Sequence, residues 1–177
     1  MTAKIAAARV TTLSDRELED LCDATVEAIK DGGGFGWLKP PPRHVLEAYW
    51  RGVLLVAERM MFIGRLDGTI AGSAQIQRPP RNNEAQAHSC WLTTSFVAPW
   101  ARGHGLAHLN TETAEAAARE AGYLTLNLDV RETQARAIDL YKSLGYVHWG
   151  TNPRYARVDG KAVAGLYFYK VLIGEGP

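Results

Sequence analysis

The sequence predicts an α/β fold in which helices flank a mixed central sheet. Hydrophobic residues recur with a period of about two in some segments and about 3.6 in others, which is typical of strands and helices respectively. The expected order is one strand, two helices, three strands, a helix, a strand, a helix and two strands. With 177 residues, 46% hydrophobic and 22% charged, the chain can bury a core, and we expect residues 1–177 to form a single domain.

The first expected helix has a clear start and a clear end. Residues 8–13 have strand character. Ser14 and Glu17 then fit a capping box, in which each side chain can bond the backbone N–H of the other residue. The apolar residues that follow share one helical face: Leu18, Leu21, Cys22, Thr25, Val26 and Ile29. Three glycines at positions 32–34 end the helix, because glycine is disfavoured inside helices.

The loop at residues 32–42 changes from glycine-rich and flexible to proline-rich and stiff. Between these parts it carries two aromatic residues, Phe35 and Trp37. Loops often carry binding residues, so the two side chains either anchor the loop on the core or belong to a lid over a substrate site. A helix over residues 43–54 follows, with Pro42 close to its first position.

The rest of the chain alternates between strands and helices. Asp67-Gly68 predicts a tight hairpin turn between strands at residues 60–66 and 69–77. After a polar loop at residues 78–83, the further elements are a strand at 87–97, a helix from about 106 to about 121, a strand at 124–130, a helix at 133–144, a short strand at 146–150, a loop at 152–160 with an Asp159-Gly160 turn, and a strand at 163–172. Asp129 lies on the face of its strand opposite the aliphatic residues.

Charge and composition exclude several classes of function. Lys and Arg total 20 and Asp and Glu total 19, so a formal net charge of +1 predicts no nucleic-acid partner and no binding to an anionic membrane. No apolar run approaches the roughly 18 residues of a membrane span, and residues 1–10 lack the apolar core of a signal peptide. We therefore expect a cytoplasmic protein. Cys22 and Cys90 lack metal-ligand spacing, and we expect buried free thiols.

The stretch at residues 97–107 has the features of a phosphate site. An apolar strand ends at Val97, and Gly103 and Gly105 precede a helix. The N–H groups and dipole of a helix N-terminus attract anions, and glycine lets a phosphate approach the backbone. A P-loop is excluded because the sequence contains no Gly-Lys-Ser/Thr. A dinucleotide-binding turn fits poorly, because His108 occupies its third glycine position.

Two motifs resemble segments of the GNAT superfamily of N-acetyltransferases. The superfamily's acetyl-CoA pyrophosphate loop is similar to the pattern Arg102-x-x-Gly105-x-Ala107, which is preceded by Val97-Ala98-Pro99. A second superfamily segment, Asn-x-x-Ala-x-x-Leu-Tyr-x-x-x-Gly-Phe/Tyr, resembles Gln134-x-x-Ala137-x-x-Leu140-Tyr141-x-x-x-Gly145-Tyr146, with Gln134 in place of the usual Asn. The resemblance implies the GNAT fold, a mixed and mostly antiparallel sheet of about seven strands flanked by about four helices.

A narrower resemblance is to the tabtoxin-resistance acetyltransferases. It consists of short matches along most of the chain, including Ala71-Gly72-Ser73-Ala74-Gln75, Leu128-Asp129 and Pro153-x-Tyr155. This resemblance implies acetylation of a small, amino-acid-like compound such as an antibiotic or toxin.

The superfamily resemblance implies acetyl-CoA as the cofactor and assigns roles to particular residues. The residues matched to cofactor binding are Phe96, Val97, Arg102, Gly103, His104, Gly105, Leu106, Ala107, Gln134 and Tyr141. The glycine turn would hold pyrophosphate, the end of the preceding strand would hold pantetheine, and the backbone N–H of Val97 would stabilise the thioester oxygen. Tyr141 would give a proton to the leaving thiolate, whereas without the motif it would be an ordinary core aromatic.

The sequence leaves open which group takes the proton from the acceptor amine. Many GNAT enzymes place Glu on the fourth strand, but Trp91 occupies that position here. Asp129 is the best remaining carboxylate and matches an acid of the tabtoxin-resistance relatives, although it also fits a turn acid before the next helix. His88, Glu84 and a chain of waters are weaker alternatives. The candidates for substrate binding are Phe35, Trp37, Trp91, Asp129 and Tyr155.

These observations predict an acetyl-CoA-dependent N-acetyltransferase acting on the primary amine of a small molecule. We expect direct attack within a ternary complex, because no Cys lies beside Tyr141 or the glycine turn to carry the acetyl group. The alternatives are a protein or peptide N-acetyltransferase and a non-catalytic acyl-CoA-binding sensor. We expect no metal, because the histidines lack ligand spacing, and either a monomer or a homodimer.

Overall fold

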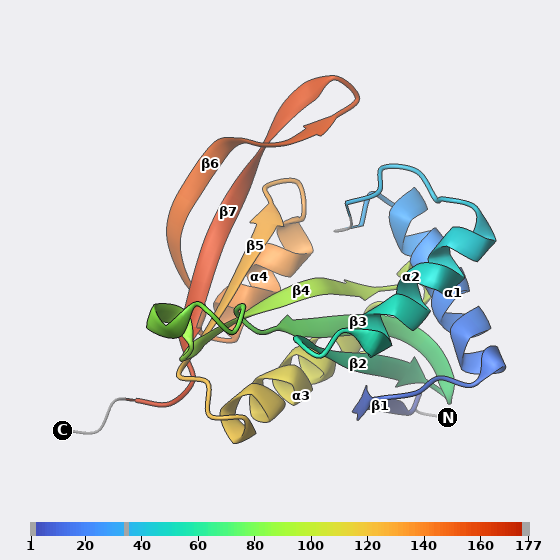
Figure 1. Ribbon diagram of the computed structural model, residues 1–177. Helices are drawn as coiled ribbons and strands as arrows, with labels where there is room; N and C mark the ends of the chain where they lie inside the picture. The colour runs from blue at the N-terminus through green and yellow to red at the C-terminus, as the bar shows by residue number, and fades with distance from the viewer. Residues whose placement is uncertain (1–2, 34–35, 175–177) are drawn as a thin grey trace.

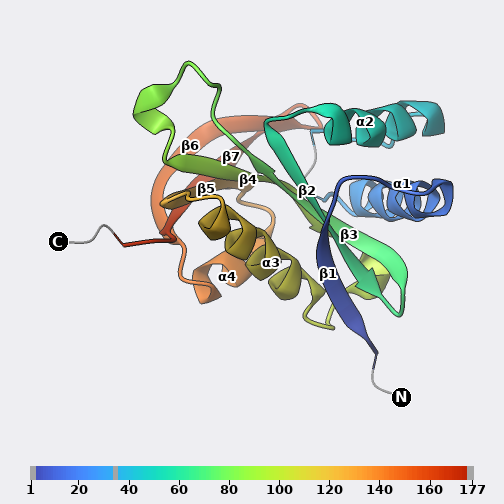
Figure 2. The same cartoon turned by 60° about the horizontal axis from the view of Figure 1, so that its bottom comes forward.

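The computed structural model describes residues 3–33 and 36–174, which form a seven-stranded mixed sheet with the strand order β1-β2-β3-β4-β5-β7-β6. Helices α1 and α2 cover one face of the sheet, and helices α3 and α4 cover the other (Figure 1, Figure 2). The elements are β1 (Ile5–Val10), α1 (Asp15–Lys30), α2 (Arg43–Leu55), β2 (Arg59–Leu66), β3 (Thr69–Gln77), β4 (Ser89–Val97), α3 (Leu106–Glu120), β5 (Thr125–Arg131), α4 (Ala135–Ser143), β6 (Val147–Val158) and β7 (Lys161–Val171). The predicted sheet and its flanking helices are confirmed.

The alternation of side chains along the strands divides the core into two layers. In β2, Met60 and Phe62 pack with residues of α3 and α4, whereas Met61 and Ile63 pack with residues of α1 and α2. All four side chains are almost completely buried. Strand β2 can therefore carry apolar residues on both of its faces, because helices cover both faces of the sheet. Within the described residues, no helix is long and apolar enough to cross a membrane.

The capping box at the start of α1 is confirmed, but the first strand lies earlier than expected. The Ser14 N–H donates to Glu17 Oε2 at 2.8 Å, and the Glu17 N–H donates to Ser14 Oγ at 3.3 Å. The strand spans Ile5–Val10 instead of residues 8–13. Its position is set by pairing with β2 and by two bonds of 2.8 Å between Lys4 and Asp67, the turn residue of the β2–β3 hairpin. This long-range pairing leaves no local signal in the sequence.

Strand β6 corrects the expectation of a loop at residues 152–160. The strand continues to Val158, and the predicted turn follows at Asp159 and Gly160, with φ values of 47° and 77°. β6 is an edge strand, so Pro153 can lie in it without depriving a second neighbour of a hydrogen bond. The pairing jumps from Asn152 opposite Gly165 to Ala156 opposite Val163, so residues 153–155 form a bulge opposite Ala164.

Strands β4 and β5 form the one parallel pair among the described strands, and they separate after a short contact. Pairing runs from Ser89 opposite Thr125 to Trp91 opposite Asn127. Beyond it β5 pairs only with β7, and Figure 1 shows β4 and β5 running apart. Thr94, at φ 48°, lies in a bulge of β4 against β3 that increases the bend of the strand. The sheet therefore opens in its middle, where β4 and β5 separate.

Candidate active site

The opening between β4 and β5 contains a cavity of about 520 Å³. Its walls come from the loop after α1, from β4, from β5, from α4 and from the bulge of β6: Gly36, Leu38, Leu92, Thr93, Thr94, Ser95, Asp129, Val130, Arg131, Gln134, Ala137, Tyr141, Tyr155, Ala156 and Arg157. Four of the predicted site residues, Asp129, Gln134, Tyr141 and Tyr155, thus meet at one place. Segments more than a hundred residues apart in the chain converge there, which explains why the sequence alone did not outline the cavity.

The last residue of β4 directs its backbone into this opening. The N–H of Ala98 donates to the carbonyl of Ala71 at 2.7 Å, so the ladder to β3 runs through Phe96 and Ala98. Because hydrogen-bonding residues alternate in an antiparallel pair, the N–H and C=O of Val97 point to the side away from β3. The Val97 carbonyl accepts a bond from Arg102 Nε at 3.3 Å on that side. The Val97 N–H therefore also faces the side away from β3, where it could donate to an oxyanion.

The glycine turn lies next to this strand end, at the start of α3. Gly103 and Gly105 have φ values of 82° and 80°, a left-handed conformation that L-residues other than Asn and Asp adopt at a cost. Open space surrounds both glycines, since a Cβ built on Gly103 would meet no atom within 4 Å and one on Gly105 only Ile5 Cδ1, at 3.8 Å. Gly105 is the N-cap of α3, and the first turn of the helix carries no acidic residue. These features suit an anion bound to the free N–H groups of Leu106 and Ala107.

Arg102 has a structural role that its motif does not reveal. Its guanidinium bonds Asp31 Oδ2 at 2.5 Å as well as the Val97 carbonyl, and so ties the end of α1 to the end of β4. His104 is exposed, and its ring Nδ1 lies 3.3 Å from the Ala101 carbonyl oxygen. The neighbouring side chains thus shape the turn, while the glycines and the helix N-terminus leave the space for an anion.

Tyr141 brings a neutral hydroxyl to the cavity from α4. The side chain is 6% exposed and packs edge-on against Tyr146, with ring centroids 5.5 Å apart. Burial raises the pKa of Tyr141 above its ordinary value; a hydrogen bond with Ser95 acts in the opposite direction, and the charge of Asp129 raises the pKa further. The phenol therefore keeps its proton at neutral pH and can serve as a donor.

Asp129 and Tyr155 form a hydrogen-bonded pair on the other wall. The Tyr155 hydroxyl donates to Asp129 Oδ2, across the intervening strand β7. Burial and this bond to the carboxylate raise the pKa of Tyr155 well above the ordinary value, so that the phenol remains the donor. Asp129 is consequently held in the cavity by a neighbour from β6, and it does not act as a turn acid for α4.

The loop after α1 is fastened to residues of the cavity wall. Gln134 Nε2 donates to the Gly32 carbonyl at 2.6 Å, and a guanidinium nitrogen of Arg131 donates to the Gly33 carbonyl at 2.6 Å. The amide of Gln134, predicted to contact cofactor, thus contacts this loop. Sequence reasoning missed Arg131, although its place two residues after Asp129 puts it on the same face of β5.

The aromatic residues expected to bind substrate have different positions. Trp37 packs edge-on against Tyr49 of α2, with centroids 5.0 Å apart, and so anchors the loop on the core next to the cavity. Phe35 lies outside the described residues. Trp91 is at the end of the part of β4 that pairs with β5 and does not line the cavity, and Glu84 and His88 precede the first residue of that strand. Tyr49 was not among the predicted site residues; its hydroxyl accepts a hydrogen bond from Gln75 Nε2 at 3.3 Å.

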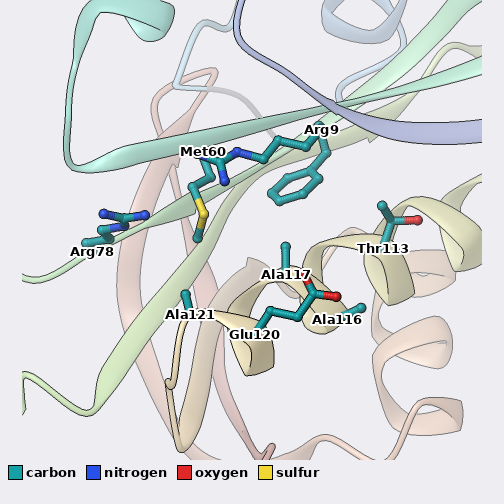
Figure 3. A pocket seen from close by; sticks show the side chains of 9 residues that line it. Arg9, Met60, Arg78, Thr113, Ala116, Ala117, Glu120 and Ala121 are labelled. Atoms are coloured by element: carbon teal, nitrogen blue, oxygen red, sulfur yellow. The ribbon is translucent and has the colours of Figure 1, made fainter.

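A second cavity, of about 410 Å³, lies on the opposite face of the sheet between α3 and the first strands. Figure 3 shows Arg9 and Arg78 at the strand side and Glu120 on the helix, around an apolar part that includes Met60. None of the predicted site residues lines it. Among the described residues, no group of three or more His, Cys, Asp or Glu could hold a metal ion. Four of the predicted site residues thus gather at the cavity between β4 and β5, which is the candidate site.

Comparison with known proteins gives a consistent result. A model of the acetyltransferase (GNAT) family matches residues 21–146. Over 128 residues the chain is 62% identical to a protein of Azospirillum brasilense described as an uncharacterized N-acetyltransferase in the hisH-hisA intergenic region; the match covers 72% of this chain and 76% of that protein.

Solved structures share the fold at low sequence identity. An N-acetyltransferase from Staphylococcus aureus Mu50 superposes with a TM-score of 0.80 at 18% identity, covering 98% of this chain and all of that one. A putative acetyltransferase from Salmonella typhimurium, solved with its cofactor acetyl-CoA, superposes with a TM-score of 0.78 at 14% identity, covering 100% of this chain and 98% of that one. At these identities the likeness concerns the fold alone.

Proposed function

The chain belongs to the GNAT acetyltransferase family, whose members take an acetyl group from acetyl-CoA, and from this premise we propose that it acetylates the primary amine of a small molecule. One observation carries the proposal. A candidate base, Asp129, and a candidate acid, Tyr141, line the same cavity of about 520 Å³, a volume typical of small-molecule sites.

The residues around the opening fit the parts of acetyl-CoA. The left-handed glycines and the first turn of α3 leave open space and free N–H groups for the pyrophosphate. The gap beside Val97 offers a backbone N–H and a carbonyl on the side away from β3, where pantetheine would lie. When bound, acetyl-CoA supplies the acetyl group as a thioester: the amine nitrogen forms the new N–C bond, the C–S bond breaks, and CoA leaves as a thiol.

Three groups of the chain serve this transfer. The Val97 N–H, on the side away from β3, would stabilise the negative charge that develops on the carbonyl oxygen. Tyr141 holds a proton on its hydroxyl oxygen for the leaving sulfur, because burial disfavours the phenolate. Asp129 takes the proton that the attacking amine gives up, and its charge also favours an ammonium group in the cavity.

Direct attack is favoured over an acetylated enzyme. Both cysteines are fully buried, and burial raises the pKa of Cys22 to about 11 and that of Cys90 to about 12. Neither residue lines the cavity. Since the thiolate is the nucleophile, neither cysteine is suited to carry the acetyl group.

We expect the enzyme to act in the cytoplasm as one domain, as a monomer or a homodimer.

The test is the release of CoA thiol from acetyl-CoA across a panel of amino acids, small amines and a peptide with a free N-terminus. We expect turnover with one or more small amines. Turnover with the peptide alone would support a protein acetyltransferase instead. Binding of CoA without turnover of any amine would support an acyl-CoA sensor.

A pair of matched variants tests the acid. Tyr141→Phe removes the hydroxyl and keeps the ring, and it should lower kcat by about 100-fold, the usual scale for a general acid, while the KM for acetyl-CoA changes little. Tyr123→Phe, two residues before β5 and outside the cavity, should leave kcat unchanged. An unchanged kcat in Tyr141→Phe would contradict the assignment.

A further inference from the structure

The bulge of β6 places one tyrosine where a regular strand could not. If the pairing of Asn152 opposite Gly165 continued without interruption, residue 155 would lie opposite residue 162, near the end of the hairpin. The bulge at residues 153–155 delays the register by two residues. Tyr155 therefore lies beside Gly165, and Gly165 pairs with Arg131 of β5, two residues from Asp129. The bulge sets the distance along the sheet at which Tyr155 meets β5.

Gly165 provides the space in which the Tyr155 ring lies. A Cβ built on Gly165 would be 2.2 Å from Cγ of Tyr155 and 2.7 Å from its Cβ, closer than real atoms come. Gly165 is not in the left-handed region, since its φ is not among the positive values. This glycine is thus required for contact and not for backbone conformation. The edge of Tyr167, with centroids 6.1 Å apart and planes at 86°, forms another side of the ring's place.

From this place the Tyr155 hydroxyl reaches across β7 and bonds one oxygen of Asp129. Carboxylate rotation about its terminal bond is otherwise broad, so a hydrogen bond to a single oxygen selects one orientation. The pair lines the same cavity as Tyr141, which α4 carries. The bulge, the missing side chain at Gly165 and the bond from Tyr155 therefore all act on one carboxylate.

We propose that Tyr155 is a positioning residue for Asp129. Its hydroxyl fixes Oδ2 of Asp129, so that Oδ1 takes the proton of the acceptor amine. The inference rests on the proposed function, in which Asp129 is the base. It also gives Gly165 a role, because any side chain there displaces the ring that holds the carboxylate.

The experiment compares steady-state kinetics of Tyr155→Phe, Asp129→Asn and the double variant, using acetyl-CoA and an amine that the panel has identified. Tyr155→Phe should lower kcat by about 10- to 100-fold, since small misplacements of a reacting group cost this much, with the KM for acetyl-CoA within about twofold. The double variant should be no slower than Asp129→Asn alone, because Tyr155 acts only through that carboxylate. Tyr123→Phe, outside the cavity, is the control for the loss of an aromatic hydroxyl, and its kcat should remain at the wild-type value.

A second variant tests the place of the ring. Gly165→Ala keeps the Tyr155 hydroxyl but cannot coexist with the present ring position, so it should lower kcat like Tyr155→Phe. Tyr155→Ala removes the ring. The double variant of Gly165→Ala and Tyr155→Ala should therefore have the same activity and nearly the same melting temperature as Tyr155→Ala alone.

The outcomes separate this inference from the function on which it rests. If Asp129→Asn retains wild-type kcat, the assigned base is wrong and the positioning role falls with it. If Asp129→Asn is slow but Tyr155→Phe is as fast as the wild type, or if the losses of the two variants multiply in the double variant, the base stands and the positioning role is refuted. Thiol release by the wild-type protein tests the acetyltransferase activity independently of both residues.

Discussion

Replacing Gly105 by Asp and, separately, by Asn tests whether the glycine turn binds a pyrophosphate. The two side chains have nearly the same shape, and both tolerate the left-handed backbone that Gly105 adopts at φ 80°. The space around Gly105 accepts either, since only Ile5 Cδ1 lies near the built Cβ, at 3.8 Å. The difference between the variants is therefore one negative charge at the N-terminus of α3.

The expected magnitude follows from Coulomb's law. A carboxylate about 6 Å from a phosphate charge is repelled by about 0.7 kcal/mol at a dielectric constant of about 80 and by about 2.8 kcal/mol at about 20. Gly105→Asp should therefore bind CoA about 3- to 100-fold more weakly than Gly105→Asn. In the free protein the sign is opposite, because a negative charge near a helix N-terminus stabilises the helix by about 0.3–1 kcal/mol.

Isothermal titration calorimetry with CoA measures the affinity difference, and urea unfolding measures the stability difference. Raising the salt concentration should reduce the affinity difference, since exposed charges are screened. Equal affinities of the Asp and Asn variants at low salt would refute a pyrophosphate at this turn. Arg102→Glu is a weaker test, because it also breaks the bond to Asp31 and would change the α1–α2 loop.

Three further predictions concern stability and reactivity. Ser14→Ala removes half of the capping box and should lower the free energy of unfolding in urea by about 1 kcal/mol without changing acetyl transfer; a loss of activity at full folding would contradict this. Lys170→Met removes the amine that lies 2.6 Å from the buried Glu115 carboxylate. It should lower the free energy of unfolding by about 3 kcal/mol, the low end for a broken buried ion pair, because Arg119 remains at 3.2 Å from Glu115. A change below about 1 kcal/mol would mean that water replaces the lost partner of Glu115. The thiols of Cys22 and Cys90 should react with a disulfide reagent at pH 8 only after unfolding. Burial raises their pKa values from 9.0 to about 11 and about 12. The buried neutral thiols therefore contribute stability below pH 9, and this contribution is lost as the pH rises toward the raised pKa values. Unfolding at alkaline pH would measure the loss.

Local signals made part of this fold predictable. Ser14 with Glu17, Asp67 with Gly68, and the two glycines of the turn each carry their information within a few residues, and the structure has the expected helix start, hairpin and turn at these places. Sequence motifs likewise selected Tyr141 and Asp129, which line the same cavity.

Other features depend on partners far away in the sequence and had no local signal. Pro153 favoured a loop, but an edge position next to β7 lets the strand continue through it. The left-handed Thr94 is a β-branched residue at a bulge, which propensity disfavours and only pairing with β3 explains. The contact of Tyr155 with Gly165 and the bond of Arg131 to Gly33 join segments whose meeting is decided by the sheet order.

The fastening of the α1–α2 loop has a thermodynamic consequence. Side chains near the opening between β4 and β5 hold this loop: Arg102 bonds Asp31, Gln134 bonds Gly32 and Arg131 bonds Gly33. A ligand that draws the Arg102 guanidinium or the Gln134 amide to itself must break a bond that ends on this loop. Linkage is reciprocal: if such a ligand loosens the loop and the amine needs the loop ordered, each weakens the binding of the other by the same free energy. These three hydrogen bonds would then couple the binding of acetyl-CoA to the binding of the amine.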